Sequence, residues 1–336
     1  MDPHHISQLF QQFQNADSAL QFILNILHPD GFVCNEHRRL CTLVHRGDGR
    51  TDYQCPESGS RHQLSIFTGT SFFGSKISVD RLLIIMLCFF IHLSNRHCEL
   101  ISGINRITVS FYYNLSNSAL CSHFCDNFIP IGGPQTIVQL DECIFHRRKN
   151  KRGRRKAQIW IFGGIETQEG GRTGRFFTCR VPYRKAETLL PIIRQNVIPG
   201  TQIWTDEWGG YNHLTEIGYP HLSVNHSQHY KDPITGCCTN AIEGLWHRLR
   251  HFLPASGVKT RKIDQMLGSF NGYSSLHLTF SEFLKVVAGY NSQNEEDASD
   301  DDDTTVDVPI VAELEDSDDN PLGITDGLEE PEFTIE

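Results

Sequence analysis

Apolar residues in the N-terminal part of the chain recur mainly at helical spacing. They do so through residues 5–27, where Asp17 stands at the position of a helix cap, and they run almost unbroken from Val79 to Leu93. Two shorter helical segments follow, Arg96–Ile104 and Thr108–Leu120, separated by a glycine turn. A short helix, a turn and a second helix are typical of a helix-turn-helix.

The pattern changes to strands from Thr136 onward. Three strand-like apolar runs come first, and helices alternate with strands after them. The segments are Thr136–Phe145, Ala157–Ile165 and Arg175–Val181 (strands), Arg184–Val197 (helix), Thr201–Thr205 (strand), Tyr211–Ile217 (short helix), Leu222–Val224 (strand) and a helix from Asn240. Strands joined by short turns form a meander, whereas strands separated by helices are joined by crossovers. This part is therefore predicted to be an α/β fold, a mixed sheet with flanking helices in which the first and fourth strands are neighbours.

These patterns divide the chain into five expected parts. They are an N-terminal helical segment (1–32), a turn-rich region (33–75), a helix-turn-helix-like helical region (76–128), the sheet domain (134–290) and an acidic tail (291–336). The most apolar stretch, Leu82–Ile91, is too short to cross a bilayer, so we expect a buried helix there and no membrane segment.

The formal net charge of −10 conceals a basic body and an acidic tail. After Lys285 there are 18 Asp and Glu and no Lys or Arg, which leaves 30 basic against 22 acidic residues in the rest. A basic body suits a nucleic-acid partner, because contact with phosphates releases counterions. The tail is too polar to bury a core, so we expect it to be disordered. Eleven scattered cysteines indicate reduced thiols, as in the cytosol or nucleus.

Three carboxylates stand where the predicted topology brings distant segments together. Asp141 lies inside the first strand, Asp206 directly follows the fourth, and Glu243 is in the first turn of the last helix. Each alone has an ordinary structural role available, as a strand-end residue, a helix cap or a helix-dipole partner. Together they suit phosphodiester chemistry, which uses two Mg²⁺ ions about 3.5–4 Å apart on carboxylate oxygens. Their neighbours Glu142 and Glu207 are expected to point to the opposite face.

Several motifs in this region resemble the ISXO-like DDE transposase domain of bacterial insertion sequences and eukaryotic Merlin transposons, over about residues 134–275. They are Leu140-Asp141-Glu142, Val181-Pro182-Tyr183-Arg184, Pro199-Gly200-Thr201, Thr205-Asp206-Glu207-Trp208, Gly210-Tyr211, Val224-Asn225-His226-Ser227 and Thr239-Asn240-Ala241-Ile242-Glu243-Gly244-Leu245-Trp246. The resemblance implies a ribonuclease-H-like fold, with Asp141, Asp206 and Glu243 as catalytic ligands of two Mg²⁺ or Mn²⁺ ions. It also implies that Asn225, His226 and Asn240 lie near the site. His226 is expected either to orient a phosphate or a water, or to be a hydrogen-bonded loop histidine.

Members of this group often carry a zinc ribbon of two Cys-x-x-Cys knuckles upstream. Here the first knuckle would be Cys34 with His37, and the second would be Cys55 with Ser58, a poor zinc ligand. Cys41 and His62 are substitutes for the missing donor, but tetrahedral zinc needs four suitable ligands. The sequence therefore favours a degenerate ribbon without structural Zn²⁺.

Basic residues gather in the turn between the first two strands and on the last helix. They are Arg147, Arg148, Lys149, Lys151, Arg152, Arg154, Arg155 and Lys156 in the turn, and Arg248 and Arg250 on the helix. A charge run is usually solvated surface, but one that projects from the strand of Asp141 favours contact with the DNA backbone, and it also suits a nuclear localisation signal. Trp204, Trp208 and Trp246 are expected in the core.

The sequence thus predicts a nuclear, metal-dependent DNA transposase. It would cleave double-stranded DNA at terminal inverted repeats and join the freed 3′-OH to target DNA, acting as a homo-oligomer. Two alternatives stay open, a transposon-derived DNA-binding protein without catalysis and a plain nuclease of the same fold. The degenerate ribbon and the acidic tail favour the first alternative, and the intact set of three carboxylates argues against it.

Overall fold

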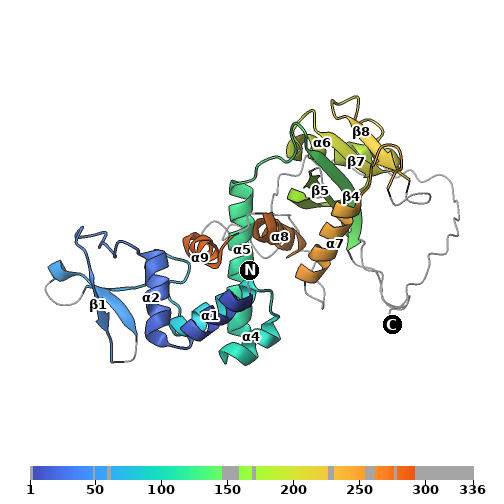
Figure 1. The fold of residues 1–336 in the computed structure, drawn as a ribbon. Helices are drawn as coiled ribbons and strands as arrows, with labels where there is room; N and C mark the ends of the chain where they lie inside the picture. Colours follow the sequence, from blue (N-terminus) through green and yellow to red (C-terminus); the bar gives the residue numbers. More distant parts are fainter. Residues whose placement is uncertain are drawn as a thin grey trace.

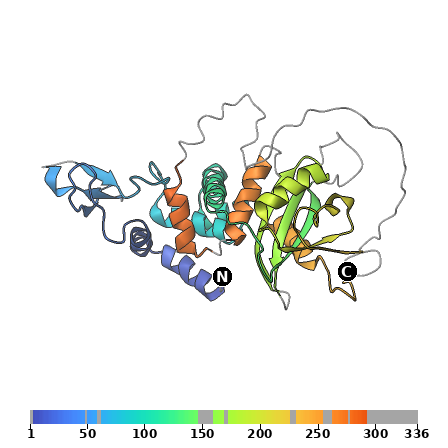
Figure 2. The same ribbon diagram turned by 90° about the horizontal axis from the view of Figure 1, so that it is seen from above.

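The computed structural model describes residues 3–47, 50–58, 62–145, 159–168, 172–225, 231–253, 262–275 and 278–291. The predicted basic turn (147–156), His226 and the acidic tail beyond residue 291 lie outside these ranges. Two bodies are seen in Figure 1, a helical one that carries a small sheet and one built on a larger sheet. The long helix α5 (Arg106–Asp126) lies between α9 (Phe280–Gly289) and α8 (Ile263–Ser275) in both views (Figures 1 and 2).

The N-terminal body is organised around α3 (Val79–Phe90), whose residues from Leu82 to Phe90 are all buried. The helices α1 (Pro3–Phe13), α2 (Ala16–Leu27), α5 and α9 contribute to the same core. The helical segment expected over residues 5–27 forms two helices, α1 and α2. Asn15 caps α2, accepting a hydrogen bond from the Ser18 amide at 2.9 Å, so the predicted cap at Asp17 is wrong because Asp17 already lies inside the helix.

The predicted helix-turn-helix segments are helices. α4 (Asn95–Ser102) ends at Gly103, whose φ of 68° is the left-handed conformation that glycine adopts readily, and α5 follows after an Asn105 cap. α5 continues six residues beyond the predicted end at Leu120, because α8 packs against it. A Cβ at Gly272 would lie 2.6 Å from the Leu120 carbonyl oxygen, so glycine allows the two helices to approach closely.

The chain returns to the first body at its C-terminal end. Side chains of α9, among them Phe280, Phe283 and Val287, belong to the N-terminal core, so the segment 134–290 is not one unit in space. α8 connects the bodies, since it packs on α5 and also bonds the larger sheet. There the Asn271 side chain accepts hydrogen bonds from the amide and hydroxyl of Thr178 at 3.1 and 2.7 Å.

The larger sheet has five strands in the order β6-β5-β4-β7-β8. β4 (Ile137–Phe145), β5 (Ile159–Thr167) and β6 (Thr173–Val181) form the predicted antiparallel meander, and β7 (Gln202–Asp206) and β8 (His221–Val224) run parallel to β4. The predicted adjacency of the first and fourth strands is therefore confirmed. The helix expected at Tyr211–Ile217 is reduced to a 3-10 turn, η2 (Gly209–Tyr211), followed by turns.

Helices cover both faces of this sheet, and each face has its own core. α6 (Ala186–Asn196) packs on one face with Leu189, Ile193 and the side chain of Tyr211. α7 (Asn240–Phe252) and α8 pack on the other with Trp246 and Phe270. The sheet domain is thus a three-layer sandwich with an apolar core on each face of the sheet.

The small sheet stands at one end of the molecule (Figure 1). Its strands β1 (Thr42–His45), β2 (Thr51–Gln54) and β3 (Gln63–Ser65) are antiparallel, and the turn η1 (Pro56–Ser58) follows β2. It packs on the N-terminal core through Tyr53, which stacks on Phe32 with ring centroids 4.8 Å apart, while β1 is largely exposed. Among the described residues no helix combines the length and apolar character needed to span a membrane.

Candidate functional site

Asp141 and Asp206 lie side by side on neighbouring strands. The parallel pairing of β4 with β7 is recorded up to Gln139 opposite Trp204. Continued by two residues, this register places Asp141 beside Asp206, and burial and the charge of Asp206 both raise the pKa of Asp141. Parallel strands are about 4.8 Å apart, and residues in register share a face of the sheet. The strand end that carries Asp206 therefore brings its carboxylate to that of Asp141.

Two anchors on β4 hold α7, the helix that carries Glu243, against this pair. The Gln139 side-chain oxygen accepts hydrogen bonds from the amides of Ala241 and Ile242 at 2.9 and 3.2 Å, which fixes the start of the helix. One turn after Glu243, the Trp246 indole N–H donates to Oδ2 of Asp141 at 2.8 Å. Glu243 lies between the two anchors along the helix, so the helix start faces the strand that carries Asp141.

The electrostatics of Asp141 reflect this convergence. Burial raises its pKa to about 6, the hydrogen bond from Trp246 opposes the rise, and the negative charges of Asp206 and Glu243 add to it. In the part of the chain that the structure describes, Asp141 forms no ion pair with Lys or Arg. Three mutually repelling carboxylates at one place are stabilised by divalent cations.

The donor set suits hard ions of the Mg²⁺ type, which prefer carboxylate oxygens. Oδ2 of Asp141 accepts the hydrogen bond from Trp246. The three carboxylates are not among the described groups whose donor atoms all lie within 4.8 Å of one another.

The three predicted near-site residues have different surroundings. The buried Oδ1 of Asn240, at the first position of α7, has no hydrogen-bond partner among the described residues, so a neutral acceptor is available beside the carboxylates. Asn225 follows β8 and donates to Glu207 at 2.6 Å, and it lines a hollow together with Asp206 and Trp208. His226 lies outside the described residues.

The two neighbouring glutamates belong to other surroundings. Glu142 is buried on the opposite side of β4 from Asp141, where Tyr211 donates to it at 2.5 Å and Arg184 lies 4.0 Å away. Burial raises the pKa of Glu142 to about 7. Glu207 is exposed and is bonded to Asn225. Strand alternation therefore places Glu142 on the opposite face of β4 from Asp141, as expected. Glu207 follows the end of β7 and lines the same hollow as Asp206.

An arginine stacked between two tryptophans lies next to the hollow. The guanidinium carbon of Arg184 is 4.2 Å from the ring centroid of Trp160 and 4.3 Å from that of Trp208. Trp208 is 41% exposed and donates its indole N–H to the Arg184 carbonyl at 3.0 Å. The prediction of Trp208 as a core residue is therefore wrong: it lies at the surface because it covers the arginine.

The predicted DNA-binding residues are described only in part. Arg248 lies over the Phe176 ring, 5.2 Å from its centroid, so part of its side chain is used in packing. Arg250 is exposed, and its charge lowers the pKa of the Cys143 thiol near the end of β4, although burial raises that pKa overall. The eight basic residues of the turn lie outside the described ranges.

Three residues of this site were missed from the sequence. They are Gln139, Trp246 as the partner of Asp141, and Gly163, which pairs with Asp141 across β4 and β5. A Cβ at Gly163 would lie 2.6 Å from the Trp246 ring, so glycine leaves the room in which the indole reaches the carboxylate. The glycine pair 163–164 inside a strand was the available signal, since such glycines mark a close approach.

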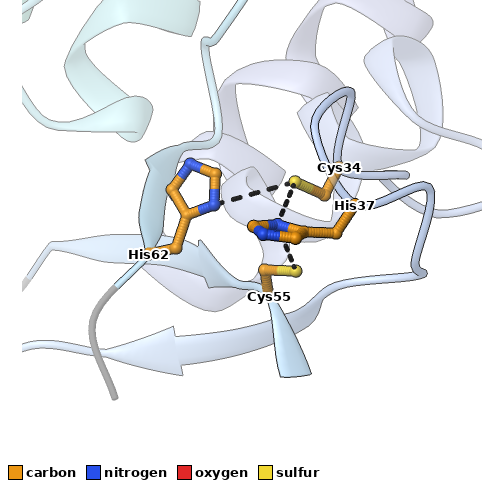
Figure 3. Close-up of side chains that lie close together, drawn as sticks. All are labelled: Cys34, His37, Cys55 and His62. Carbon is orange, nitrogen blue, oxygen red and sulfur yellow. Dashed lines mark hydrogen bonds between the residues drawn. The ribbon is translucent and has the colours of Figure 1, made fainter. Parts of the chain in front are cut away.

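The N-terminal region holds a second group of potential metal ligands (Figure 3). Cys34, His37, Cys55 and His62 each offer a donor atom, and these four atoms all lie within 4.8 Å of one another. Of the two substitutes considered for the poor ligand Ser58, His62 and not Cys41 joins the group as the fourth donor, so four donors converge where the sequence favoured a degenerate ribbon. His62 supplies that donor because the β2–β3 hairpin folds it back beside Cys55.

Comparison with known proteins bears on the sheet domain. Residues 131–257 match the ISXO2-like transposase domain, and this span contains all three carboxylates. Over 94 residues the chain is 33% identical to an uncharacterized transposase-like protein of Haemophilus influenzae, in an alignment that covers 28% of this chain and 75% of that protein. Both findings agree with the resemblance seen in the sequence motifs.

Proposed function

Because the chain belongs to the ISXO2-like transposase domain family, we propose that it is a DDE-type DNA transposase. Asp141, Asp206 and Glu243 would hold two Mg²⁺ or Mn²⁺ ions. The observation that carries the proposal is the meeting of two strand carboxylates with the start of α7, which is tied to β4 through Gln139 and Trp246. The order of the five strands, a meander followed by two parallel strands, supports a ribonuclease-H-like fold.

The protein's part in the reaction is to hold the three carboxylates in fixed orientations. When bound, the ions would activate a water and then the 3′-OH, and would stabilise the leaving oxygen. Trp246 fixes the orientation of the Asp141 carboxylate, and Gln139 fixes the helix that presents Glu243. Asp206 is held by its own local bond, since its Oδ1 accepts from the Trp208 amide at 3.0 Å. Ligands fixed in advance reduce the reorganisation that the reaction needs.

Double-stranded DNA is the proposed substrate, at the element's terminal inverted repeats and at the target. The exposed Arg250 lies on the helix that carries Glu243, and in the sequence the basic run 147–156 follows the strand that carries Asp141, which suits contact with DNA phosphates. Transposition needs the two transposon ends to be paired, so we expect at least a dimer. The same basic run suits nuclear import.

The decisive experiment uses a labelled duplex that ends in the inverted repeat flanking the coding sequence. Purified wild type is incubated with it in Mg²⁺ or Mn²⁺ and compared with Asp206→Asn. Glu207→Gln is the matched control, because it neutralises the adjacent carboxylate, which is bonded to Asn225 instead. We expect joined products from wild type and the control, and none from Asp206→Asn.

The products also separate the alternative functions. Hydrolysis without joining would indicate a nuclease, and binding without either product would indicate a DNA-binding protein derived from a transposon. Equal cleavage by wild type and Asp206→Asn would exclude the proposed site.

A further inference from the structure

We propose that Cys34, His37, Cys55 and His62 bind one structural Zn²⁺ ion. The four residues surround a single point next to the small sheet (Figure 3), in a part of the chain outside the span that matches the transposase domain. The proposal does not depend on the catalytic function, since it concerns different residues and a different class of ligand.

The distances between the donor atoms are those of a tetrahedron around zinc. Zn–S bonds of about 2.3 Å and Zn–N bonds of about 2.0–2.1 Å at tetrahedral angles place sulfur and nitrogen about 3.6 Å apart. The structure gives 3.5 Å between Cys34 Sγ and His37 Nδ1, 3.6 Å between Cys55 Sγ and His37 Nδ1, and 3.8 Å between Cys34 Sγ and His62 Nδ1. Three sulfur–nitrogen edges thus agree with a common centre.

Hydrogen bonding alone explains this arrangement less well. The single Nδ1 of His37 faces two sulfurs at nearly equal distance, and the sulfur of Cys34 faces two imidazole nitrogens. An imidazole nitrogen forms one hydrogen bond in its plane, so it cannot serve both thiols at once. A cation between the four atoms satisfies all of them together.

The backbone builds each half of the site separately. In the first half, the Cys34 amide donates to the Arg39 carbonyl and the Arg38 amide to the Cys34 carbonyl, both at 2.8 Å. Arg38 has a φ of 54°, and this tight turn folds His37 back over Cys34. In the second half, the Cys55 amide donates to the His62 carbonyl at 3.2 Å, which continues the β2–β3 register.

The chemistry of the donors selects zinc. Thiolate and imidazole together favour Zn²⁺, whereas Mg²⁺ and Mn²⁺ prefer the oxygens of the carboxylate site. The buried Cys41 lies close by, but its sulfur contacts the Arg39 carbonyl at 3.8 Å and it is not among the four convergent donors. Glu36 lies 3.4 Å from Nδ1 of His62, but its side chain is 71% exposed, and we place it outside the ligand set.

A metal would also link two parts of this region that are far apart in the sequence. The small sheet meets the N-terminal core through Tyr53, which stacks on Phe32, and the His28 ring bonds the Ile66 carbonyl at 3.0 Å. Small units of this kind are commonly stabilised by a structural ion. The proposed zinc would tie the loop after α2 to the β2–β3 hairpin.

The test measures metal in the full-length protein, purified with excess Mg²⁺ so that the carboxylate site does not retain zinc. We expect one zinc per chain in wild type, and a loss of most of it in His62→Ala. His45→Ala is the matched control, a histidine of the same sheet that bonds Thr51 and lies outside the cluster. Cys41→Ser is expected to keep its zinc.

Cobalt substitution keeps the test independent of variants that fail to fold. Wild type loaded with Co²⁺ should show the visible bands of tetrahedral cobalt together with thiolate charge transfer, and His62→Cys should bind the ion with stronger charge transfer. Wild type that carries no zinc and gives no tetrahedral cobalt spectrum would overturn the proposal. So would zinc loss in Cys41→Ser with full retention in His62→Ala.

Discussion

The two groups of ligands in this protein differ in how they are supported. The four donors of the N-terminal group lie within 4.8 Å of one another, beside a three-stranded sheet whose first strand is largely exposed. The three carboxylates of the sheet domain are spaced more widely and stand on a five-stranded sheet with a core on each face. We therefore expect the proposed zinc to stabilise its surroundings, whereas the carboxylates stand on a sheet with cores of its own.

This difference shows in the contacts of single ligands. Asp141 is oriented by Trp246, a buried core residue, before any ion is bound. The Cys34 sulfur and the His37 Nδ1 atom make their side-chain polar contacts with members of their own group. An ion is therefore expected to act as a reactant-positioning group in the sheet domain and as part of the fold in the N-terminal unit.

Removal of metal should have the largest effect and should separate the two regions. A strong chelator is expected to abolish DNA cleavage and also to speed amide exchange in the β1–β3 unit at least about 100-fold, equivalent to about 2.8 kcal/mol. Amides of β4 and β5 should keep their protection. Hydrogen exchange followed by mass spectrometry measures both regions in one sample.

Adding ions back completes this test. Mg²⁺ alone should leave the β1–β3 amides unprotected, whereas Zn²⁺ should restore their protection. If chelation opened β4 and β5 as well, or left both regions unchanged, the contrast between a structural and a reactive ion would be lost.

Substitution of Gly163 by alanine tests the internal support of the carboxylate site. The new methyl would meet the Trp246 ring at 2.6 Å, so the indole must move and its bond to Asp141 is weakened. We expect cleavage to fall about 10–100-fold and the free energy of unfolding to fall by about 1–3 kcal/mol. Single-turnover cleavage and denaturant unfolding measure the two effects.

Gly244→Ala is the matched control for that substitution. A Cβ at Gly244 meets nothing within 4 Å, and alanine favours a helix over glycine by about 1 kcal/mol. This variant should cleave normally with equal or higher stability. Normal cleavage by Gly163→Ala would show that the Trp246 bond does not support the site.

Regular features of the sheet domain were predictable because they depend on local pattern and on topology. Apolar runs located β4 to β8, and the crossover between β6 and β7 placed β7 beside β4. Once those two strands are neighbours, their register alone brings Asp141 and Asp206 together. The order of the elements in the sequence therefore predicts that Asp141 and Asp206 are neighbours.

Features that depend on side-chain packing were not predictable in this way. His62 becomes a neighbour of Cys34 only through the hairpin, and no fixed spacing in the sequence announces it. The same holds for α9, whose residues Phe280 and Phe283 belong to the N-terminal core although the helix follows the sheet domain in the sequence. Trp246 had the pattern of a core residue, and its N–H bond to Asp141 is visible only in three dimensions.

Neutralising Asp141 should stabilise the protein in the absence of metal. Asp141 has a pKa raised from 3.8 to about 6, so the folded state holds a proton that the unfolded chain has lost between these values. Stability is therefore present below pH 3.8 and is lost as the pH rises to about 6. With about 1.4 kcal/mol for each pKa unit, Asp141→Asn should gain about 1–3 kcal/mol at pH 7.

Unfolding of the metal-free proteins from pH 4 to pH 8 measures this gain. The advantage of Asp141→Asn should grow up to about pH 6 and then level, while its cleavage activity is lost. A variant less stable than wild type at pH 7 would show that Asp141 is paired with a cation, and would remove the reason for a metal there.

The smallest effect on catalysis is expected from Glu142→Gln, one residue further along the same strand. Glu142 faces the opposite side of β4, where Tyr211 donates to it at 2.5 Å, and the glutamine carbonyl can accept the same bond. Its pKa of about 7 means that wild type is partly neutral there already, so cleavage at pH 7 should change by less than about threefold. Divalent ions should also raise the melting temperature of Glu142→Gln as much as that of wild type, and that of Asp141→Asn much less. A loss of both cleavage and ion-induced stabilisation in Glu142→Gln would indicate that the ion binds on the other face of β4. The comparison between the two ligand groups would then no longer hold.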